Sequence, residues 1–142
     1  GPSDAQLWGR FQRLSYHGHP VILDAAHNPH GMAFLTTQLS QTLAPRTSAS
    51  RPLRVVFSML GDKDIAGVVS ILAPWVQKWY LSALTVPRAA TLEQLGSALQ
   101  AADPDAIIEM AATPLEAFQA AIAEQQPDET LEALWGELSH HG

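Results

Sequence analysis

The sequence predicts an α/β domain of three layers, in which a mostly parallel sheet is covered by helices on both faces. Short apolar runs, such as Val21 to Asp24 and Leu53 to Ser58, alternate along the chain with segments whose apolar residues recur at helical spacing. The length of 142 residues and the hydrophobic content of 46% suit one globular domain with a sizeable core. Strands that alternate with helices favour a parallel sheet covered on both sides.

The first half of the chain is expected to begin with a hairpin. Residues 11–16 and 21–24 are candidate strands, and His17-Gly18-His19-Pro20 between them is typical of a tight turn. A polar loop then leads to a helix predicted from Gly31 to Leu43, and a second buried strand is predicted at 53–58. The first half of the chain therefore contains two predicted buried strands, 21–24 and 53–58, that are each followed by a polar loop.

The second half carries the clearest helix signals. Asp64 is placed to cap a helix that runs through Leu72, and Pro74 is expected to stop or kink it. Two capping boxes predict helices at 92–101 and from 114 to near 126; their residues are Thr91 with Gln94 and Thr113 with Glu116. Strands are predicted around Trp79 to Leu81 and at 106–110.

The domain organisation has three parts. Residues 1–8 are interpreted as a tag scar, since Gly1-Pro2-Ser3 resembles a protease-cleavage remnant, followed by an interdomain linker. The α/β domain occupies 9–126, and 127–142 is an atypical tail. Leu131, Leu134, Trp135 and Leu138 follow helical spacing, so we expect residues 128–139 to form a helix. Such a helix would leave the sheet one strand short, with an exposed edge that the tail or a second copy covers; a monomer is favoured and a dimer is the alternative.

Composition excludes several function classes. A net charge of −6 argues against a nucleic-acid surface, which needs clustered Lys and Arg. No apolar run approaches the length of a membrane span, so no membrane partner is expected. The absence of cysteine excludes disulfides and thiolate metal sites and fits a cytoplasmic protein.

Polar residues follow two of the predicted strands. Asp24, His27, Asn28 and His30 come after the first, and Asp62 with Lys63 after the second. Parallel sheets bind ligands at the carboxyl ends of their strands, so these residues are candidate ligand contacts. Asn28 before Pro29 is also typical of a turn. His17, His19, His27 and His30 together raise the alternative of a metal site, but no cysteine or grouped carboxylate supports it, and we expect no metal ligand here.

One motif makes the sequence resemble a known family. Leu23-Asp-Ala-Ala-His-Asn-Pro-His-Gly31 resembles the motif of the dihydrofolate synthase/folylpolyglutamate synthase family, within the Mur ligase superfamily. Three further segments match at the expected intervals: Gly9-Arg10-Phe11-Gln12, Ser58 to Ile65, and Pro87 to Leu95. The resemblance extends from about Gly9 to about Glu124, and it covers only the C-terminal domain of the family enzyme.

The resemblance implies an ATP-dependent ligase that adds L-glutamate to dihydropteroate or folates, with ATP and Mg²⁺ as cofactors. It places nucleotide contacts at Arg10, Asp24 and His27, because the family holds the matching residues beside ATP. Four further residues would face the cleft on the glutamate side, namely Asn28, His30, Asp62 and Lys63. The family carries its phosphate-binding loop, Mg²⁺ ligands and most of the folate pocket in an N-terminal domain, and the Gly-x-x-x-x-Gly-Lys-[Ser/Thr] motif is absent here. No catalytic residue is therefore assigned, and the isolated chain is expected to be inactive.

Two alternatives remain open. The chain could be a non-catalytic remnant or interaction domain that binds nucleotide at most weakly, which the missing phosphate-binding loop favours. It could also be the C-terminal domain of a ligase that adds an amino acid to a peptidoglycan precursor, although the Asp-x-Ala-His-Asn-Pro string and Gly61-Asp62-Lys63-Asp64 point to the folate branch. The end of the chain departs from the family, because no Gly-Ser-x-His turn follows Pro127.

Overall fold

The computed structural model describes residues 12–16, 19–24, 37, 51, 53–126 and 130–134, with side chains described for 37, 51 and 53–126. The predicted hairpin is confirmed: strands β1 (Gln12–Tyr16) and β2 (His19–Asp24) pair in antiparallel register. His19 and Pro20 belong to β2, so the connection is shorter than predicted. Of the helix expected at 31–43, only Thr37 is described, in helical conformation.

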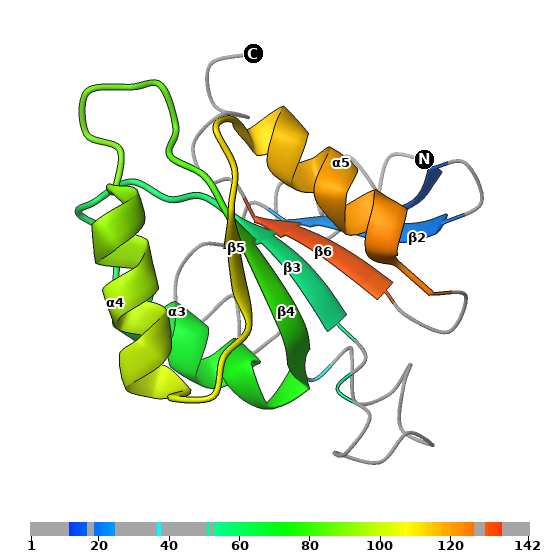
Figure 1. The fold of residues 1–142 in the computed structure, drawn as a ribbon, viewed down its shortest axis with the longest axis horizontal. Helices are drawn as coiled ribbons and strands as arrows, with labels where there is room; N and C mark the ends of the chain where they lie inside the picture. The colour runs from blue at the N-terminus through cyan, green and yellow to red at the C-terminus, as the bar shows by residue number, and fades with distance from the viewer. Residues whose placement is uncertain are drawn as a thin grey trace.

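The described strands form one six-stranded sheet in the order β1-β2-β6-β3-β4-β5. All neighbours except β1 and β2 run parallel, as predicted for this fold class. Figure 1 shows the twisted sheet, in which β6 and β3 are the two central strands and β5 lies at the edge beside β4. The four described strands after the hairpin are β3 (Leu53–Phe57), β4 (Val76–Leu81), β5 (Ile108–Met110) and β6 (Thr130–Leu134).

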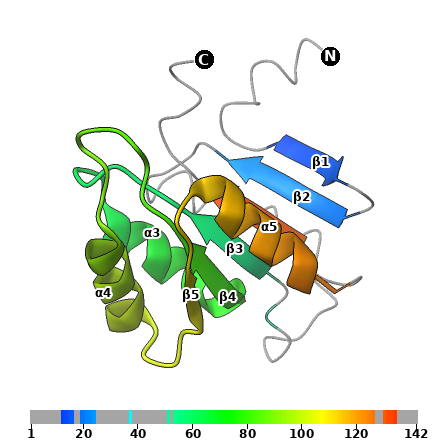
Figure 2. The same ribbon diagram turned by 45° about the horizontal axis from the view of Figure 1, so that its top comes forward.

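Helices cover the two faces of the sheet and complete three layers. Helices α3 (Ile65–Leu72) and α4 (Leu92–Ala102) pack on one face, where Phe57, Trp79 and Leu95 share a buried core. Helix α5 (Pro114–Glu124) packs on the other face over β3 and β4, as Figure 2 shows. The predicted three-layer α/β class is confirmed. None of the described helices is long and apolar enough to span a membrane.

The helix caps form where the sequence signals place them. The Asp64 carboxylate accepts a hydrogen bond from the Gly67 backbone N–H at 3.0 Å, and Thr91 and Thr113 cap α4 and α5 in the same way. Helix α3 ends at Leu72, and Pro74 lies in the 3₁₀ turn η2 (Ala73–Trp75) that follows it. Local side-chain chemistry therefore sets these helix boundaries.

The prediction of a helical tail is wrong for the part of it that the structure describes. Thr130–Leu134 forms β6, which lies between β2 and β3 and pairs in parallel with both. The sheet is therefore not short of a strand at this point, and no edge is left open there for a helix to cover. The Leu-Glu-Ala-Leu pattern fits a helix locally, but a strand with neighbours on both sides gains two ladders of backbone hydrogen bonds. Strands of parallel sheets are rich in apolar residues without strict alternation, so the apolar residues of this segment are also compatible with a parallel strand.

Candidate functional site

Five parallel strands end at the same level, and this common edge is where the predicted ligand contacts belong. The last residues of the strands pair in one row across the sheet: Asp24, Leu134, Phe57, Leu81 and Met110. Asp24 and the loop that begins after Phe57 therefore lie on the same edge. This carboxyl edge is the usual ligand-binding side of a parallel sheet.

The loop after β3 presents charged residues at this edge. Asp62 is exposed and Lys63 is half-buried, immediately before the cap residue Asp64. The turn is held by backbone hydrogen bonds from Lys63 N–H to the Leu60 carbonyl at 3.3 Å and from Ile65 N–H to the Lys63 carbonyl at 2.9 Å. The Asp64 carboxylate caps α3, so its side chain faces the helix N-terminus, and Asp62 and Lys63 are the two members of this charged triplet considered as ligand contacts.

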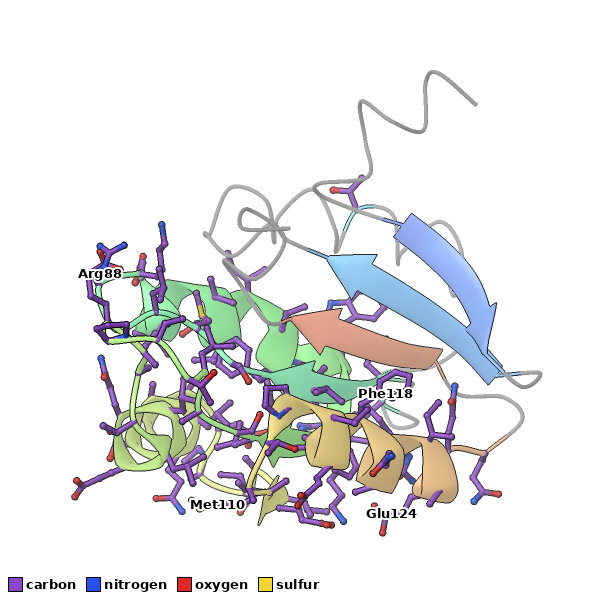
Figure 3. The ribbon with its side chains drawn as sticks, turned by 90° about the horizontal axis from the view of Figure 1, so that it is seen from above. Arg88, Met110, Phe118 and Glu124 are labelled. Atoms are coloured by element: carbon purple, nitrogen blue, oxygen red, sulfur yellow. The ribbon has the colours of Figure 1, made fainter. Side chains whose placement is uncertain are left out.

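Arg88 joins this group from the loop after β4. Its guanidinium lies 2.9 Å from the Asp62 carboxylate, and both side chains are more than half exposed. Figure 3 shows Arg88 on the side toward which the arrows of the parallel strands point. Arg88 was not among the predicted ligand contacts, and its place in the Pro87 to Leu95 segment is its only signal in the sequence. The loops after β3 and β4 thus bring the cations Lys63 and Arg88 and the anion Asp62 to the carboxyl edge, beside the cap residue Asp64.

The two loops are bound to each other by their backbones. The Gly61 N–H donates to the Arg88 carbonyl at 2.7 Å, and the Ala90 N–H donates to the Met59 carbonyl at 2.9 Å. An isolated antiparallel bridge pairs Leu60 with Ala89 between these two bonds. The segments 59–61 and 88–90 therefore form one short antiparallel ladder above the parallel sheet.

Two side-chain contacts support this ladder from below and from the side. At its base the buried hydroxyls of Ser58 and Ser82, which follow β3 and β4 directly, share a hydrogen bond of 2.8 Å. At its side the Gln94 amide of α4 donates to the Gly61 carbonyl at 3.1 Å. The loop backbones that carry Asp62, Lys63 and Arg88 are therefore held in place by several hydrogen bonds.

A family match identifies the kind of domain that this carboxyl edge is part of. Residues 9–132 match the family described as Mur ligase, glutamate ligase domain. This chain belongs to that family. The family match ends within β6, so the strand that replaces the predicted helical tail lies inside the matched region.

Solved and curated relatives agree with this assignment of the glutamate ligase domain. The dihydrofolate synthase/folylpolyglutamate synthase of Escherichia coli is 44% identical over 95 residues, which are 67% of this chain and 21% of that protein. FolC of Escherichia coli, solved with ADP and without folate substrate, has a TM-score of 0.74 and 34% identity over 90% of this chain and 28% of its own. A bifunctional folylpolyglutamate synthase/dihydrofolate synthase with Mn, AMPPNP and L-glutamate bound has a TM-score of 0.73 and 30% identity over 89% of this chain and 28% of its own. The chain thus spans about a fifth of the length of the Escherichia coli relative.

The structure brings some of the predicted site residues of the glutamate ligase domain together at the carboxyl edge. Asp24 ends β2, and Asp62 and Lys63 lie in the loop after β3 on the same edge. The other predicted contacts lie outside the described residues, and they are Arg10, His27, Asn28 and His30. Their placement therefore stays a prediction.

The described part of the domain offers no grouping of three or more His, Cys, Asp or Glu side chains that could hold a metal ion. Asp62 is paired with Arg88, and Asp64 caps α3. Of the four histidines considered as metal ligands, only His19 lies within the described residues, in β2. These residues do not fit a Mg²⁺ site, and no chemical step is assigned to such an ion here.

A second polar group lies on the α5 face of the sheet, and sequence reasoning missed it. Arg54 of β3 is buried and donates to the Tyr80 hydroxyl at 2.8 Å and to Gln77 at 2.6 Å. Tyr80 donates in turn to the carboxylate of Glu124, near the end of α5, and Lys78 donates to the same carboxylate at 2.8 Å. The group ties α5 to β3 and β4, so its role is structural.

The charges of this second group shift one another's pKa values. Hydrogen bonds from Lys78 and Tyr80 lower the pKa of Glu124 below its ordinary 4.5. Burial and the bond to Glu124 raise the pKa of Tyr80 to about 12. For Lys78, burial alone would lower the pKa, but the hydrogen bonds to Glu109 and Glu124 outweigh it and raise the pKa. Each shift favours the state in which the group makes these hydrogen bonds at neutral pH: Glu124 ionised, Tyr80 neutral and Lys78 protonated.

These shifts predict the pH dependence of stability. The lowered pKa of Glu124 contributes stability above about pH 4.5, and this is lost as the pH falls through the folded-state pKa. The Glu124→Gln variant should lower the free energy of unfolding by about 0.5–1 kcal/mol at neutral pH, a small value because the carboxylate is 44% exposed. Denaturant unfolding at about pH 7 and about pH 3 measures the difference, which should shrink at the lower pH. A difference that is equal at both values would contradict the assigned role of Glu124.

Proposed function

We propose that this domain forms the C-terminal part of an ATP-dependent ligase that adds L-glutamate to dihydropteroate or folates. The observation that carries the proposal is the family match over 9–132, together with charged residues gathered at the carboxyl edge of the sheet. Relatives with the same domain are named dihydrofolate synthase/folylpolyglutamate synthase, and one was solved with AMPPNP, Mn and L-glutamate bound. The domain's share of the work is to bind and orient nucleotide and amino acid.

The chemistry explains why cations are useful at this edge. In such a ligase ATP phosphorylates a carboxyl group, and the amine of L-glutamate then attacks the acyl phosphate and displaces phosphate. Glutamate brings two carboxylates to the site, and Lys63 and Arg88 are cations at the carboxyl edge. Because the Asp62–Arg88 pair is exposed, its net stabilisation is small, and an acidic ligand can compete with Asp62 for the guanidinium. Lys63 and Arg88 therefore suit the glutamate side of the cleft, with Asp62, Asn28 and His30.

Nucleotide contacts are proposed at Arg10, Asp24 and His27. Asp24 ends β2 at the carboxyl edge, where a carboxylate can accept hydrogen bonds from ribose hydroxyls. Arg10 offers a planar fork of donors that suits phosphate oxygens. The Mg²⁺ that would accompany ATP supplies charge neutralisation for phosphoryl transfer, and its ligands are proposed in the part of the ligase that this chain does not match.

The test compares the 142-residue chain alone with a joined enzyme. In the joined enzyme, the chain replaces the matching C-terminal segment of the Escherichia coli dihydrofolate synthase/folylpolyglutamate synthase. With ATP, Mg²⁺, dihydropteroate and labelled L-glutamate, we expect product from the joined enzyme and none from the chain alone, which lacks the phosphate-binding motif. Turnover by the chain alone would overturn the need for a partner domain.

A variant ties the activity to this edge. Lys63→Ala in the joined enzyme should raise KM for L-glutamate about tenfold or more, the effect of losing one charge-assisted contact. Gln100→Ala, an exposed residue of α4, serves as the control and should leave KM unchanged. A folded joined enzyme that makes no product would favour the alternative of an interaction domain that binds nucleotide at most weakly.

A further inference from the structure

The Gln94 side chain does not make the contact that its sequence position predicts. Gln94 is the third residue of α4, where a capping box would return its side chain to the backbone N–H of Thr91. The Thr91 hydroxyl does accept from the Gln94 N–H at 3.0 Å, which is one half of the box. The Gln94 amide, however, reaches across to the loop after β3 and donates to the Gly61 carbonyl at 3.1 Å.

The fit between Gln94 and Gly61 is close. A Cβ added at Gly61 would lie 3.3 Å from Gln94 Oε1 and 3.4 Å from the Arg88 carbonyl oxygen, which is tighter than ordinary contact. The carbonyl and the N–H of Gly61 are both engaged, the first by Gln94 and the second by Arg88 at 2.7 Å. The peptide groups on either side of Gly61 are thus fixed by two different elements.

We propose that Gln94 is a positioning residue for Asp62 and Lys63. The inference rests on the proposed function, in which these two residues face glutamate. The backbone of the turn from Leu60 to Lys63 sets the position and direction in which the Lys63 side chain leaves the chain, and therefore the region that its flexible side chain lets the ammonium reach. Gln94 holds that turn from α4, while the ladder with residues 88–90 holds it from the loop after β4. Contacts of this kind keep ligand-binding groups within the narrow range of geometry that binding requires.

The Gln94→Glu variant separates positioning from folding. Glutamate keeps the length and shape of the side chain but has no N–H to donate to Gly61. At the third position of a helix a carboxylate is favoured by the capping box and by the helix dipole, so α4 should keep its stability. The variant should therefore melt like the parent protein while the turn loses its tie to α4.

The first measurement uses the 142-residue chain itself. In Gln94→Glu the amide protons of Gly61 and Lys63 should exchange with solvent about fivefold faster, as expected when one hydrogen bond that restrains a loop is lost. Gln100→Glu, which makes the same change at an exposed site on the same helix, should leave these rates unchanged. Equal exchange in the parent and in Gln94→Glu would overturn the proposal.

The second measurement uses the joined enzyme. Gln94→Glu should raise KM for L-glutamate about five- to tenfold with little change in KM for ATP, and Gly61→Ala, which disturbs the same contact from the other side, should act alike. Combined with Lys63→Ala, Gln94→Glu should add less than it does alone, because part of its effect acts through the Lys63 ammonium. An unchanged KM in Gln94→Glu, with Lys63→Ala still effective, would overturn the positioning role alone. An unchanged KM in Lys63→Ala would overturn the glutamate role of the loop, and this inference with it.

Discussion

Replacing Trp79 by alanine should lower the free energy of unfolding by about 3–5 kcal/mol, because it removes a large side chain from the core between the sheet and helices α3 and α4. Trp79 is 1% exposed and packs edge-to-face on Phe57, with ring centroids 5.6 Å apart. Its indole N–H finds no hydrogen-bond partner within the described residues, so the side chain is held by packing. Denaturant unfolding followed by circular dichroism measures the loss.

Trp79→Phe is the matched control. Phenylalanine keeps much of the packing and removes the unsatisfied N–H, so the variant should cost about 1–2 kcal/mol, well below the alanine variant. Equal losses in the two variants would mean that the indole N–H has a partner that stabilises the fold. A loss below about 1 kcal/mol in Trp79→Ala would contradict its place in the core.

Arg54→Ala should lower the free energy of unfolding by about 2–4 kcal/mol, since it leaves buried hydrogen-bonding groups without their cation. The Arg54 side chain is 10% exposed and bonds to Tyr80 and Gln77, with Glu124 at 3.8 Å. Arg88→Ala makes the same change at an ion pair whose members are 71% and 53% exposed, and it should cost at most about 0.5 kcal/mol. Thermal and denaturant unfolding of both variants measure the difference. Similar losses would show that burial does not separate these two arginines.

The contrast between the two arginines shows what a sequence pattern can and cannot predict. Within β3, Arg54 interrupts an otherwise apolar run, and nothing local indicates that Tyr80 and Glu124 meet it. Those partners come from another strand and from α5, so the network exists only after the layers have packed. The helix caps at Asp64, Thr91 and Thr113 were predictable because donor and acceptor lie within three residues of each other.

The tail and the site show the same difference between features that local sequence predicts and features that depend on contacts between distant elements. Leu131 to Leu134 fits helical spacing, and only pairing with β2 and β3 makes this segment a strand. At the site, the loop after β3 was predicted because a motif marks Asp62 and Lys63. Arg88 and Gln94 were missed as members of it, because their contacts with Asp62 and Gly61 cross between elements.

The position of β6 has a consequence for how the domain is made. β6 is the last described strand in the sequence, yet it lies between the first hairpin and the β3-β4-β5 block. Among the described strands, these two blocks have no other ladder in common. During synthesis, the β1-β2 hairpin and the β3-β4-β5 block are therefore expected to stay unpaired with each other until Thr130–Leu134 emerges from the ribosome. Until then β2 and β3 each have an open edge. Open strand edges invite pairing with other chains, and contacts between residues distant in sequence form slowly. The nascent chain is thus most exposed to misassembly just before β6 is added, and chaperone protection at that stage would matter more than for a sheet built in sequence order.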